Sequence, residues 1–383
     1  MHKFHVLAVR DVQPDAEDAV RLTLEVPPSL ESTFRSQAGQ HVVVRLLLEG
    51  IEQRRTYSVI GRAGELPLTL VVRMHERGRC SLYLGRALRR GDQLELMPPT
   101  GSFGAALAQA AEAPRGALYV MFVAGSGITP VLSIVHTALA EQPRARVLLF
   151  FGNRNSARTM CFEDLQALKN RFMGRIALHF LMSDEPQEVQ LLNGRIDGAK
   201  VRALAEQLFD AGAVDAYFVC GPGTMIEDVG RELRALGVAP ERIHAEHFNL
   251  DAHAEHAQAT PHAGVGRAIT DAESETPRAP AALPAAEPSG HTEVTVLMDG
   301  RRRTFPMRTA DETILDAAAR AGLDLPYSCR AGVCSTCRTK LLRGAVEMRE
   351  NYALEDWELE QGYILACQSR AKTPELELDY DAR

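Results

Sequence analysis

The chain has 383 residues, of which 45% are apolar, and a formal net charge of −7 at pH 7. This length predicts two or three domains with sizeable hydrophobic cores. The acidic balance argues against a general nucleic-acid binder, and no apolar run approaches the length of a membrane-spanning helix. The first residues contain no signal-peptide core, so we expect a cytoplasmic protein without a membrane partner.

The first part of the chain is rich in short strand patterns. Apolar and β-branched residues dominate 41–48, 55–60 and 68–73, and turn residues separate these runs at short intervals. This spacing predicts a small antiparallel β-barrel, which we place at residues 1–108.

Three short motifs follow one another within this region. They are Arg55-Thr56-Tyr57-Ser58, Gly78-Arg79-Cys80-Ser81 and Pro99-Thr100-Gly101-Ser102-Phe103-Gly104. The second motif precedes a helical pattern, and a glycine and a serine at a helix N-terminus place backbone N–H groups and a hydroxyl where a phosphate could bind. Taken singly, the first is a strand with an exposed arginine and the second an ordinary helix cap. All three in this order are hard to obtain by chance.

Residues 115–250 show a different pattern. Continuous apolar runs at 117–123, 146–151, 176–182 and 215–220 alternate with helical stretches. Such runs predict a parallel sheet that is covered by helices on both faces, as in an α/β domain.

A glycine-rich turn, Gly125-Ser126-Gly127-Ile128-Thr129-Pro130, follows the first of these apolar runs. Glycines let the pyrophosphate of a dinucleotide approach the backbone, and a helix N-terminus favours its negative charge. A bare G-x-G is a weak signal, but this one lies between a strand and an amphipathic helix pattern, as a nucleotide site requires. The candidate binding residues are Gly125, Gly127, Thr129 and Pro130.

The second apolar run ends near Asn153 and Arg154, with Arg158 shortly after. Basic residues at such a strand end suit the 2′-phosphate of NADPH, whereas an acidic residue would bind the ribose 2′-hydroxyl of NADH. No acidic residue follows before Glu163. We therefore expect NADPH as the electron donor. The alternative is that both arginines are solvated surface residues.

Residues 251–290 separate this module from the rest of the chain. They are rich in alanine, proline and polar residues and have almost no large apolar side chains. Such a segment cannot bury enough surface to offset its chain entropy, so we expect a flexible linker. The histidines at 253, 256 and 262 could suggest a metal site, but a solvated tether is the simpler interpretation.

The last segment, 291–383, contains four cysteines in the pattern C-x4-C-x2-C…C: Cys329, Cys334, Cys337 and Cys367. This spacing is typical of a plant-type [2Fe–2S] cluster. A structural zinc site would favour two C-x2-C pairs, and disulfides would need an oxidising compartment.

The residues around the cysteines support the cluster. A hairpin is expected with Asp299-Gly300 at its turn, followed by a helix over 311–321 that ends at Gly322. Gly332 can adopt positive φ and so aim backbone N–H groups at sulfur. Hairpin, helix and cysteine loop together resemble a plant-type ferredoxin, which implies an α+β domain of the β-grasp type.

The motifs of residues 4–250, in their order, resemble the ferredoxin–NADP reductase superfamily. The resemblance implies that Arg55 neutralises the flavin phosphate, Tyr57 packs on the isoalloxazine, and Ser58 bonds near its N5 atom. Gly78 and Ser81 would hold the pyrophosphate. The full set of implied flavin-binding residues is Arg55, Thr56, Tyr57, Ser58, Gly78, Cys80 and Ser81. FAD is expected, although related reductases with FMN carry similar motifs.

The same resemblance places the turn Cys220-Gly221-Pro222 beside the nicotinamide ring and includes Met225 among the cofactor-binding residues. Phe248 would lie close to the flavin, and the implied catalytic residues are Ser58, Cys220 and Glu246. From the residues alone, Cys220 is a buried cysteine that ends a core strand.

Almost the whole chain resembles the family of reductase subunits of the multicomponent ring-1,2-phenylacetyl-CoA epoxidases. The matching stretches include RRTYSVIGR, AGSGITPVLSIV, LLNGRIDGAKV, CGPGTMIEDV and LPYSCRAGVCSTCRTKLLRGAVEMRENYALEDW. Two departures are the long 251–290 segment and Cys80, where that family often has an aromatic residue. The resemblance implies a cofactor set of FAD, a [2Fe–2S] cluster and NADPH. The oxygenase subunits of a multicomponent di-iron enzyme would be the electron acceptor.

Two alternatives stay open at this point. The chain could be the reductase of a different aromatic or aliphatic oxygenase. It could also be a redox sensor that binds flavin and cluster but supplies electrons to no enzyme.

Overall fold

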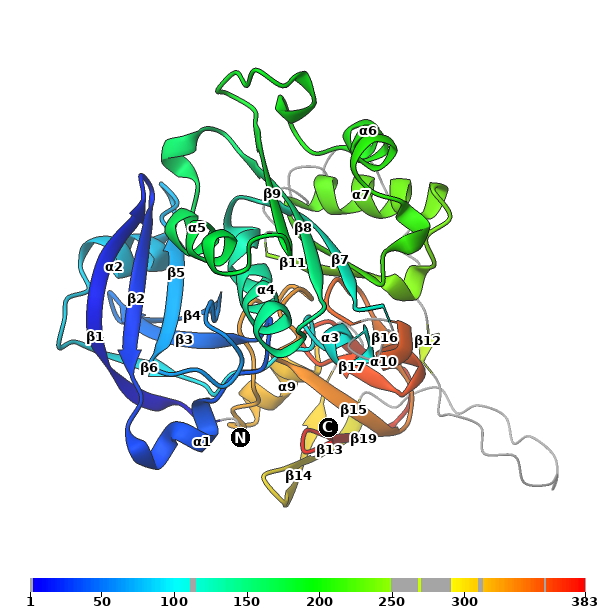
Figure 1. The fold of residues 1–383 in the computed structure, drawn as a ribbon. Helices are drawn as coiled ribbons and strands as arrows, with labels where there is room; N and C mark the ends of the chain where they lie inside the picture. Colours follow the sequence, from blue (N-terminus) through cyan, green and yellow to red (C-terminus); the bar gives the residue numbers. More distant parts are fainter. Residues whose placement is uncertain are drawn as a thin grey trace. The chain divides into compact units, whose positions relative to one another are not determined.

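The computed structural model describes residues 3–110, 115–248, 268–269, 291–308, 313–354 and 356–382. The chain divides into a larger unit, Lys3–His253, and a smaller one, Ala254–Arg383 (Figure 1). Of the expected linker, only Ala268–Ile269 is described. This two-residue strand, β12, pairs antiparallel with β16 (Val346–Met348) of the smaller unit.

The larger unit begins with a six-stranded antiparallel sheet in the order β4-β3-β6-β1-β2-β5. Its strands are β1 (His5–Ala16), β2 (Ala19–Glu25), β3 (His41–Leu48), β4 (Ile51–Ser58), β5 (Leu68–Arg73) and β6 (Gln93–Leu96). A bridge between Val59, directly after β4, and Leu70 on β5 joins the two outer strands of this order. The apolar side chains that alternate along the strands fill the interior, so the expected barrel is confirmed.

Short helices accompany the barrel. They are η1 (Pro28–Leu30), α1 (Glu31–Phe34), α2 (Arg79–Arg86) and α3 (Ala106–Ala110). Leu84 on α2 is fully buried in the barrel core, which anchors this helix to the barrel.

A five-stranded parallel sheet in the order β11-β10-β7-β8-β9 forms the second half of the larger unit. Its strands are β7 (Leu118–Ala124), β8 (Arg146–Asn153), β9 (Ile176–Met182), β10 (Ala216–Gly221) and β11 (Ile243–His247). Sequence patterns predicted four of these strands. They missed β11, because it is five residues long and alternates apolar with polar side chains.

Helices cover both faces of the parallel sheet (Figure 1). Apolar residues of α4 (Ile128–Glu141) and α5 (Phe162–Arg171) belong to one core, and those of α6 (Gly198–Leu208) and α7 (Gly223–Ala235) belong to the other. The connections carry the 3-10 turns η2 (Gly125–Gly127), η3 (Ser156–Arg158), η4 (Gln190–Leu192), η5 (Ala211–Ala213) and η6 (Pro240–Arg242). None of the helices in the described part of the chain is long and apolar enough to span a bilayer.

The barrel and the parallel sheet share a core. Phe103, after the barrel, packs edge-on against Phe218 of β10 with ring centroids 5.6 Å apart. Arg21 of β2 forms ion pairs with Asp15 on its own sheet and with Asp164 on α5. Apolar packing and charge pairing therefore both fix the barrel against the nucleotide half.

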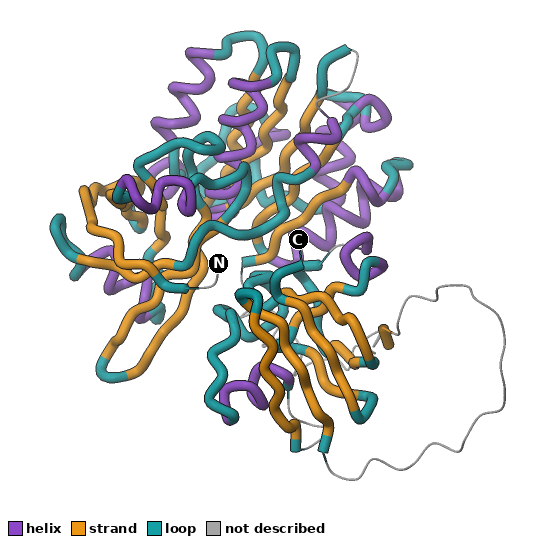
Figure 2. Tube along the Cα trace, turned by 90° about the horizontal axis from the view of Figure 1, so that it is seen from below, coloured by secondary structure: helices purple, strands orange, loops and turns teal. Residues whose placement is uncertain are grey.

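The smaller unit contains a five-stranded mixed sheet in the order β14-β13-β19-β15-β17 and a three-stranded sheet, β12-β16-β18 (Figure 2). Its remaining elements are β13 (Thr292–Met298), β14 (Arg301–Met307), α9 (Ile314–Arg320), β15 (Arg338–Arg343), α10 (Asp356–Glu360), β17 (Tyr363–Leu365), β18 (Ser369–Ala371) and β19 (Glu375–Asp379). The hairpin turn lies at Asp299-Gly300, where both residues have positive φ. The expected ferredoxin-like α+β fold is confirmed.

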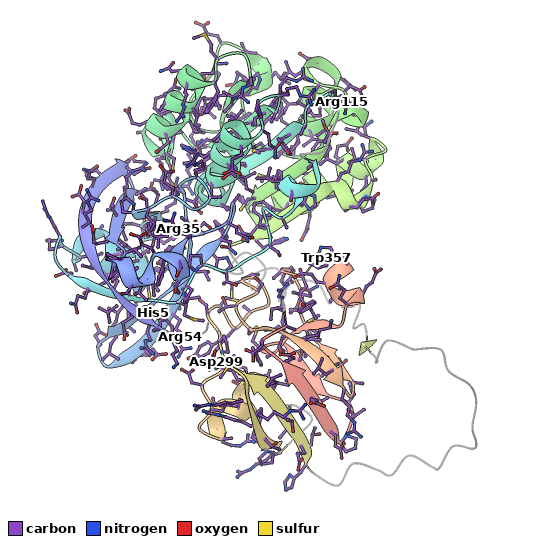
Figure 3. The ribbon with its side chains drawn as sticks, turned by 60° about the horizontal axis from the view of Figure 1, so that its bottom comes forward. His5, Arg35, Arg54, Arg115, Asp299 and Trp357 are labelled. Carbon is purple, nitrogen blue, oxygen red and sulfur yellow. The ribbon has the colours of Figure 1, made fainter. Side chains whose placement is uncertain are left out.

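Helix α10 is fixed to this unit by a buried ion pair. The carboxylate of Glu358 pairs with the guanidinium of Arg338, which immediately follows Cys337 and lies over the ring of Tyr363 at 4.4 Å. The Glu358 side chain is 1% exposed. The same helix carries Trp357, the single tryptophan of the chain, whose side chain is partly exposed (Figure 3).

We expect Glu358→Ala to destabilise the smaller unit by about 3–5 kcal/mol, because it leaves the Arg338 charge without its partner in a largely buried setting. Chemical denaturation of the full-length protein, followed by cluster absorbance, measures this loss. Glu360→Ala changes an exposed residue of the same helix and is the matched control. Equal unfolding midpoints for the two variants would contradict the expectation.

Candidate functional site

The four cysteines of the motif come together in the smaller unit. Cys329, Cys334 and Cys337 lie in the loop between α9 and β15, and Cys367 lies between β17 and β18. Side-chain hydrogen bonds join them as two pairs, Cys329 with Cys334 and Cys337 with Cys367. All four thiols are free of disulfides.

This pairing discriminates between the two metal sites that the sequence left open. Four thiolates on one tetrahedral zinc, with Zn–S bonds of about 2.3 Å, lie about 3.8 Å from one another. Among the described residues, a single group of three ligand atoms lies mutually within 4.8 Å, and it contains none of these four cysteines. Two pairs of sulfurs fit a cluster with two irons, each of which takes two thiolates.

Hydrogen-bond donors surround the sulfur atoms. The backbone N–H of Ala331 donates to Cys329 Sγ at 3.3 Å, and the side-chain amide of Gln368 donates to Cys367 Sγ at 3.6 Å. Within this pair, the Cys334 thiol and backbone N–H donors lower the pKa of Cys329, and the same contact raises the pKa of Cys334. These donors favour the thiolate form, which is the form that binds iron.

The backbone of the loop needs unusual conformations. Arg330 and Ser335 adopt positive φ angles of 56° and 48°, and Gly332 has φ of 76°. A Cβ on Gly332 would lie 2.8 Å from the carbonyl oxygen of Glu350. The buried hydroxyl of Ser328 has no hydrogen-bond partner among the described residues. Glycine thus lets the loop close, and an unused donor remains beside the ligand set.

The first group of residues expected to bind the flavin, with Arg55 for its phosphate and Tyr57 and Ser58 for its ring, lies on β4. Arg55 is exposed, and Thr56 and Tyr57 are half-buried. Tyr57 lies near both Arg55 and the buried Cys80 of α2, and burial raises the pKa of Tyr57. Ser58 ends the strand with a side-chain hydroxyl that is buried and without a partner in the described structure. A buried hydroxyl without a partner fits a polar group that binds at this strand end.

The residues expected to hold the flavin phosphates lie at the start of α2. Gly78 is the N-cap and offers no side-chain cap, so the first-turn N–H groups are free to bind an anion. The hydroxyl of Ser81 accepts from the His75 N–H at 3.1 Å and donates to the Gly78 carbonyl at 3.0 Å. A Cβ on Gly78 would overlap Ser81 Oγ. Ser81 therefore orders this turn, and backbone N–H groups remain for the phosphate.

A cavity of about 1030 Å³ joins this region to the ends of the parallel strands. Its lining includes nine of the residues predicted from sequence: Gly125, Gly127, Asn153, Arg154, Arg158, Gly221, Pro222, Met225 and Phe248. Thr129 and Pro130 are buried in the first turn of α4, where the Thr129 hydroxyl donates to the Ser126 carbonyl at 3.0 Å. They shape the turn without lining the cavity.

The close packing under the glycine turn leads to a prediction. A Cβ on Gly127 would overlap the carbonyl of Cys220 on the neighbouring strand. We expect Gly127→Ala to push the turn away from β10 and weaken nucleotide binding about tenfold or more, measured as the KM for the nucleotide. Gly230→Ala on α7 is the matched control, because its Cβ would meet nothing closer than 3.5 Å. An unchanged KM in Gly127→Ala would contradict this account.

The arginines near the end of β8 differ in their surroundings. Arg158 forms an ion pair with Asp18 of the barrel, and Arg73 also pairs with Asp18 at 2.9 Å. Arg73 donates to the Arg158 carbonyl at 2.9 Å as well. Arg154 and Arg195 are exposed, line the cavity and have no ion-pair partner among the described residues. Sequence reasoning missed Asp18, Arg73 and Arg195, because no local motif marks them.

The three catalytic candidates lie on three strands. Cys220 on β10 and Glu246 on β11 are direct neighbours in the parallel register, and Ser58 ends β4. Burial, with the Glu246 charge as a second cause, raises the pKa of Cys220 well above its usual value, so this thiol is a packing group and not a nucleophile. His41, which the sequence analysis did not single out, is the cross-strand partner of Ser58, and its Nδ1 lies 3.8 Å from Glu246 Oε1.

Comparison with protein families gives three matches along the chain. Residues 7–104 match the oxidoreductase FAD-binding domain, residues 121–231 the oxidoreductase NAD-binding domain, and residues 296–372 the 2Fe-2S iron-sulfur cluster binding domain. The three matches follow the order of barrel, parallel sheet and cysteine-containing unit.

Individual relatives agree with these matches. The chain is 38% identical over all of its length to a subunit of the 1,2-phenylacetyl-CoA epoxidase of Escherichia coli (strain K12), and covers 99% of that protein. It is 29% identical to the ferredoxin reductase component of 3-ketosteroid-9-alpha-monooxygenase from Rhodococcus rhodochrous, over 98% of this chain and 96% of the relative. Among solved structures, phthalate dioxygenase reductase has the same fold, with a TM-score of 0.55, 22% identity and 98% coverage of both chains.

The expectation of an oxidoreductase that binds FAD, a pyridine nucleotide and a [2Fe–2S] cluster is thereby confirmed. The chain belongs to the ferredoxin–NADP reductase family, in the branch of oxygenase reductase components that carry a C-terminal [2Fe–2S] ferredoxin domain.

Proposed function

We propose that this chain takes electrons from NADPH and delivers them singly to the di-iron oxygenase subunits of a phenylacetyl-CoA epoxidase. Bound FAD and the [2Fe–2S] cluster supply the conversion from a two-electron donor to one-electron transfer. The observation that carries the proposal is the presence, in one chain, of a cavity that joins the glycine turn at 125–127 to residues 75–77, just before α2, and of two cysteine pairs that fit a two-iron site.

Different residues of the chain bind the flavin and the nucleotide. The first-turn N–H groups of α2 and the Arg55 guanidinium bind the flavin phosphates, and Tyr57 and Ser58 orient the ring. The glycine turn at 125–127 receives the nucleotide pyrophosphate at the start of α4. Cys220 and Phe248 border the place where the two rings meet and exclude water from it.

The preference for NADPH rests on Arg154 and Arg195. Both guanidinium groups reach the cavity and are free of ion pairs in the described structure, so they can bind a 2′-phosphate. Two of the acidic residues that line the cavity are already engaged: Asp18 pairs with Arg73 and Arg158, and Asp197 caps α6 by accepting from the Lys200 N–H.

The proposed acceptor follows from the relative with 38% identity, whose name gives phenylacetyl-CoA epoxidase. We propose the cytoplasm as the site of action, since all seven cysteines are free of disulfides. We further propose that residues 251–290 tether the ferredoxin domain, so that it can meet first the flavin and then the oxygenase.

The test is reconstitution. The holo-protein should reduce cytochrome c with NADPH, and it should support epoxidation of phenylacetyl-CoA when it is mixed with purified epoxidase oxygenase subunits. Cytochrome c reduction without any epoxidation would overturn the acceptor and favour another oxygenase, such as those served by the relatives of lower identity. Faster turnover with NADH than with NADPH would overturn the proposal that NADPH is the electron donor.

A further inference from the structure

The motif Pro99–Gly104 lies outside the binding sites for the flavin and the nucleotide. It packs against His41 on strand β3. The backbone of His41 is bracketed by Thr100, which donates to it and accepts from it at 2.9 Å in both directions. Gly101 has φ of 120°, and a Cβ there would lie 3.2 Å from His41 Nδ1. The imidazole therefore packs directly on the Gly101 backbone, where a side chain would displace it.

The surroundings of this imidazole contain an unusual concentration of unused polar atoms. His41 Nε2, Ser58 Oγ and Glu246 Oε2 are all buried and have no hydrogen-bond partner among the described residues. A buried polar group without a partner destabilises the folded protein. Three such atoms lie close together, two at the paired ends of β3 and β4 and one on β11. Their concentration indicates that they act on a group that binds there.

The three residues are held together by the fold. His41 and Ser58 are directly opposite each other on β3 and β4, so their side chains project from the same face of the barrel sheet. Glu246 comes from β11, and its Oε1 is 3.8 Å from His41 Nδ1. This distance allows ion pairing and is a small shift away from a direct hydrogen bond.

We propose that His41 is a positioning residue of the flavin site, whose Nδ1 holds the Glu246 carboxyl group next to Ser58 so that this carboxyl group can exchange a proton at the reacting edge of the flavin. The inference rests on the proposed function, because it assumes a flavin beside Ser58. His41 faces Glu246 from the barrel, and Cys220 borders the same carboxyl group from β10.

The electrostatics of the pair agree with this role. Burial raises the pKa of Glu246 above its usual value, and the nearby imidazole of His41 opposes that rise. A buried carboxyl group with a raised pKa and a basic neighbour is suited to carry a proton. Without the imidazole, burial acts unopposed, and the pKa of the Glu246 carboxyl group should rise further.

Two substitutions at His41 separate the role of the Nδ1 atom from the role of the space that the side chain fills. His41→Phe fills the space of the imidazole but removes Nδ1, whereas His41→Asn keeps a polar group near the position of Nδ1. We expect His41→Phe to slow flavin reduction by NADPH, measured by stopped-flow absorbance of the flavin-loaded protein, by roughly 100-fold. We expect His41→Asn to recover most of that loss.

An infrared difference spectrum of reduced minus oxidised protein gives a readout that is independent of turnover. The wild type should show a carboxyl C=O band that is absent in Glu246→Gln and shifted in His41→Phe. His5→Phe, on strand β1 of the same barrel and packed edge-on against Phe34, should behave like the wild type in both experiments (Figure 3).

Several outcomes would overturn the inference. It fails if both His41 variants reduce flavin at the wild-type rate, or if the carboxyl band of His41→Phe is unchanged. If His41→Phe does not take up flavin, the flavin reduction rate and the carboxyl band of His41→Asn test the proposal instead. A carboxyl band in Glu246→Gln that matches the wild type would also count against the proposal. A wild-type protein that no pyridine nucleotide reduces would instead sink the proposed function itself.

Discussion

We expect Cys334→Ser to abolish electron delivery to one-electron acceptor proteins while the flavin is still reduced by the nucleotide. Cys334 is buried and pairs with Cys329, so its loss leaves one iron of the cluster with a single thiolate. We expect cytochrome c reduction to fall by more than about 100-fold. Reduction of ferricyanide, which a reduced flavin can carry out directly, should stay near the wild-type rate.

The control for this variant is another buried cysteine. Cys161 lies in the nucleotide half at the N-cap of α5 and is fully buried. Cys161→Ala should keep both activities and the cluster spectrum. The account of the smaller unit fails if Cys334→Ser retains the cluster absorbance and full cytochrome c reduction.

Arg154→Glu should raise the KM for NADPH by about 10- to 100-fold and leave the KM for NADH unchanged or lower. The expected size follows from a hydrogen bond to a charged group, which contributes about 1.5–3 kcal/mol. The substitution removes this interaction from the 2′-phosphate and adds a carboxylate suited to a ribose hydroxyl. Initial rates with both nucleotides measure the change.

Matched variants separate a role in nucleotide recognition from a role in the stability of the fold. Arg195→Ala should also weaken NADPH binding selectively, because its side chain lines the same cavity. Arg158→Ala should instead lower thermal stability, since this arginine joins the nucleotide half to Asp18 of the barrel. Arg144→Glu, at an exposed position outside the cavity, should change neither. An equal loss for NADPH and NADH in Arg154→Glu would contradict a 2′-phosphate contact.

Local sequence patterns were sufficient for the parts of the molecule that depend on local geometry. The Asp299-Gly300 hairpin, the glycine turn before α4 and the cysteine loop with Gly332 each need a backbone conformation that few residues allow, and the chain marks these places with glycine. Strands with continuous apolar runs, such as β7 and β8, were equally clear, because both of their faces are buried.

The remaining features depend on segments that are distant in sequence. Asp18 and Arg158 are 140 positions apart and meet only because the barrel packs on the nucleotide half. His41 and Glu246 come from different sheets, and neither stands in a motif that would name the other. For Arg158, the sequence suggested a nucleotide phosphate, and the structure adds an ion pair with Asp18 that no sequence pattern indicated. Charge alone does not reveal which partner an arginine finds.

The central claim is that one polypeptide holds a flavin and a two-iron cluster that a pyridine nucleotide can reduce. An anaerobic titration of the purified full-length protein with NADPH, followed by absorption spectroscopy and by iron and sulfide analysis, tests it most directly. We predict about two iron and two sulfide atoms per chain, with both the flavin and the cluster bands bleached by NADPH. A colourless protein that takes up neither group after anaerobic reconstitution would contradict the claim.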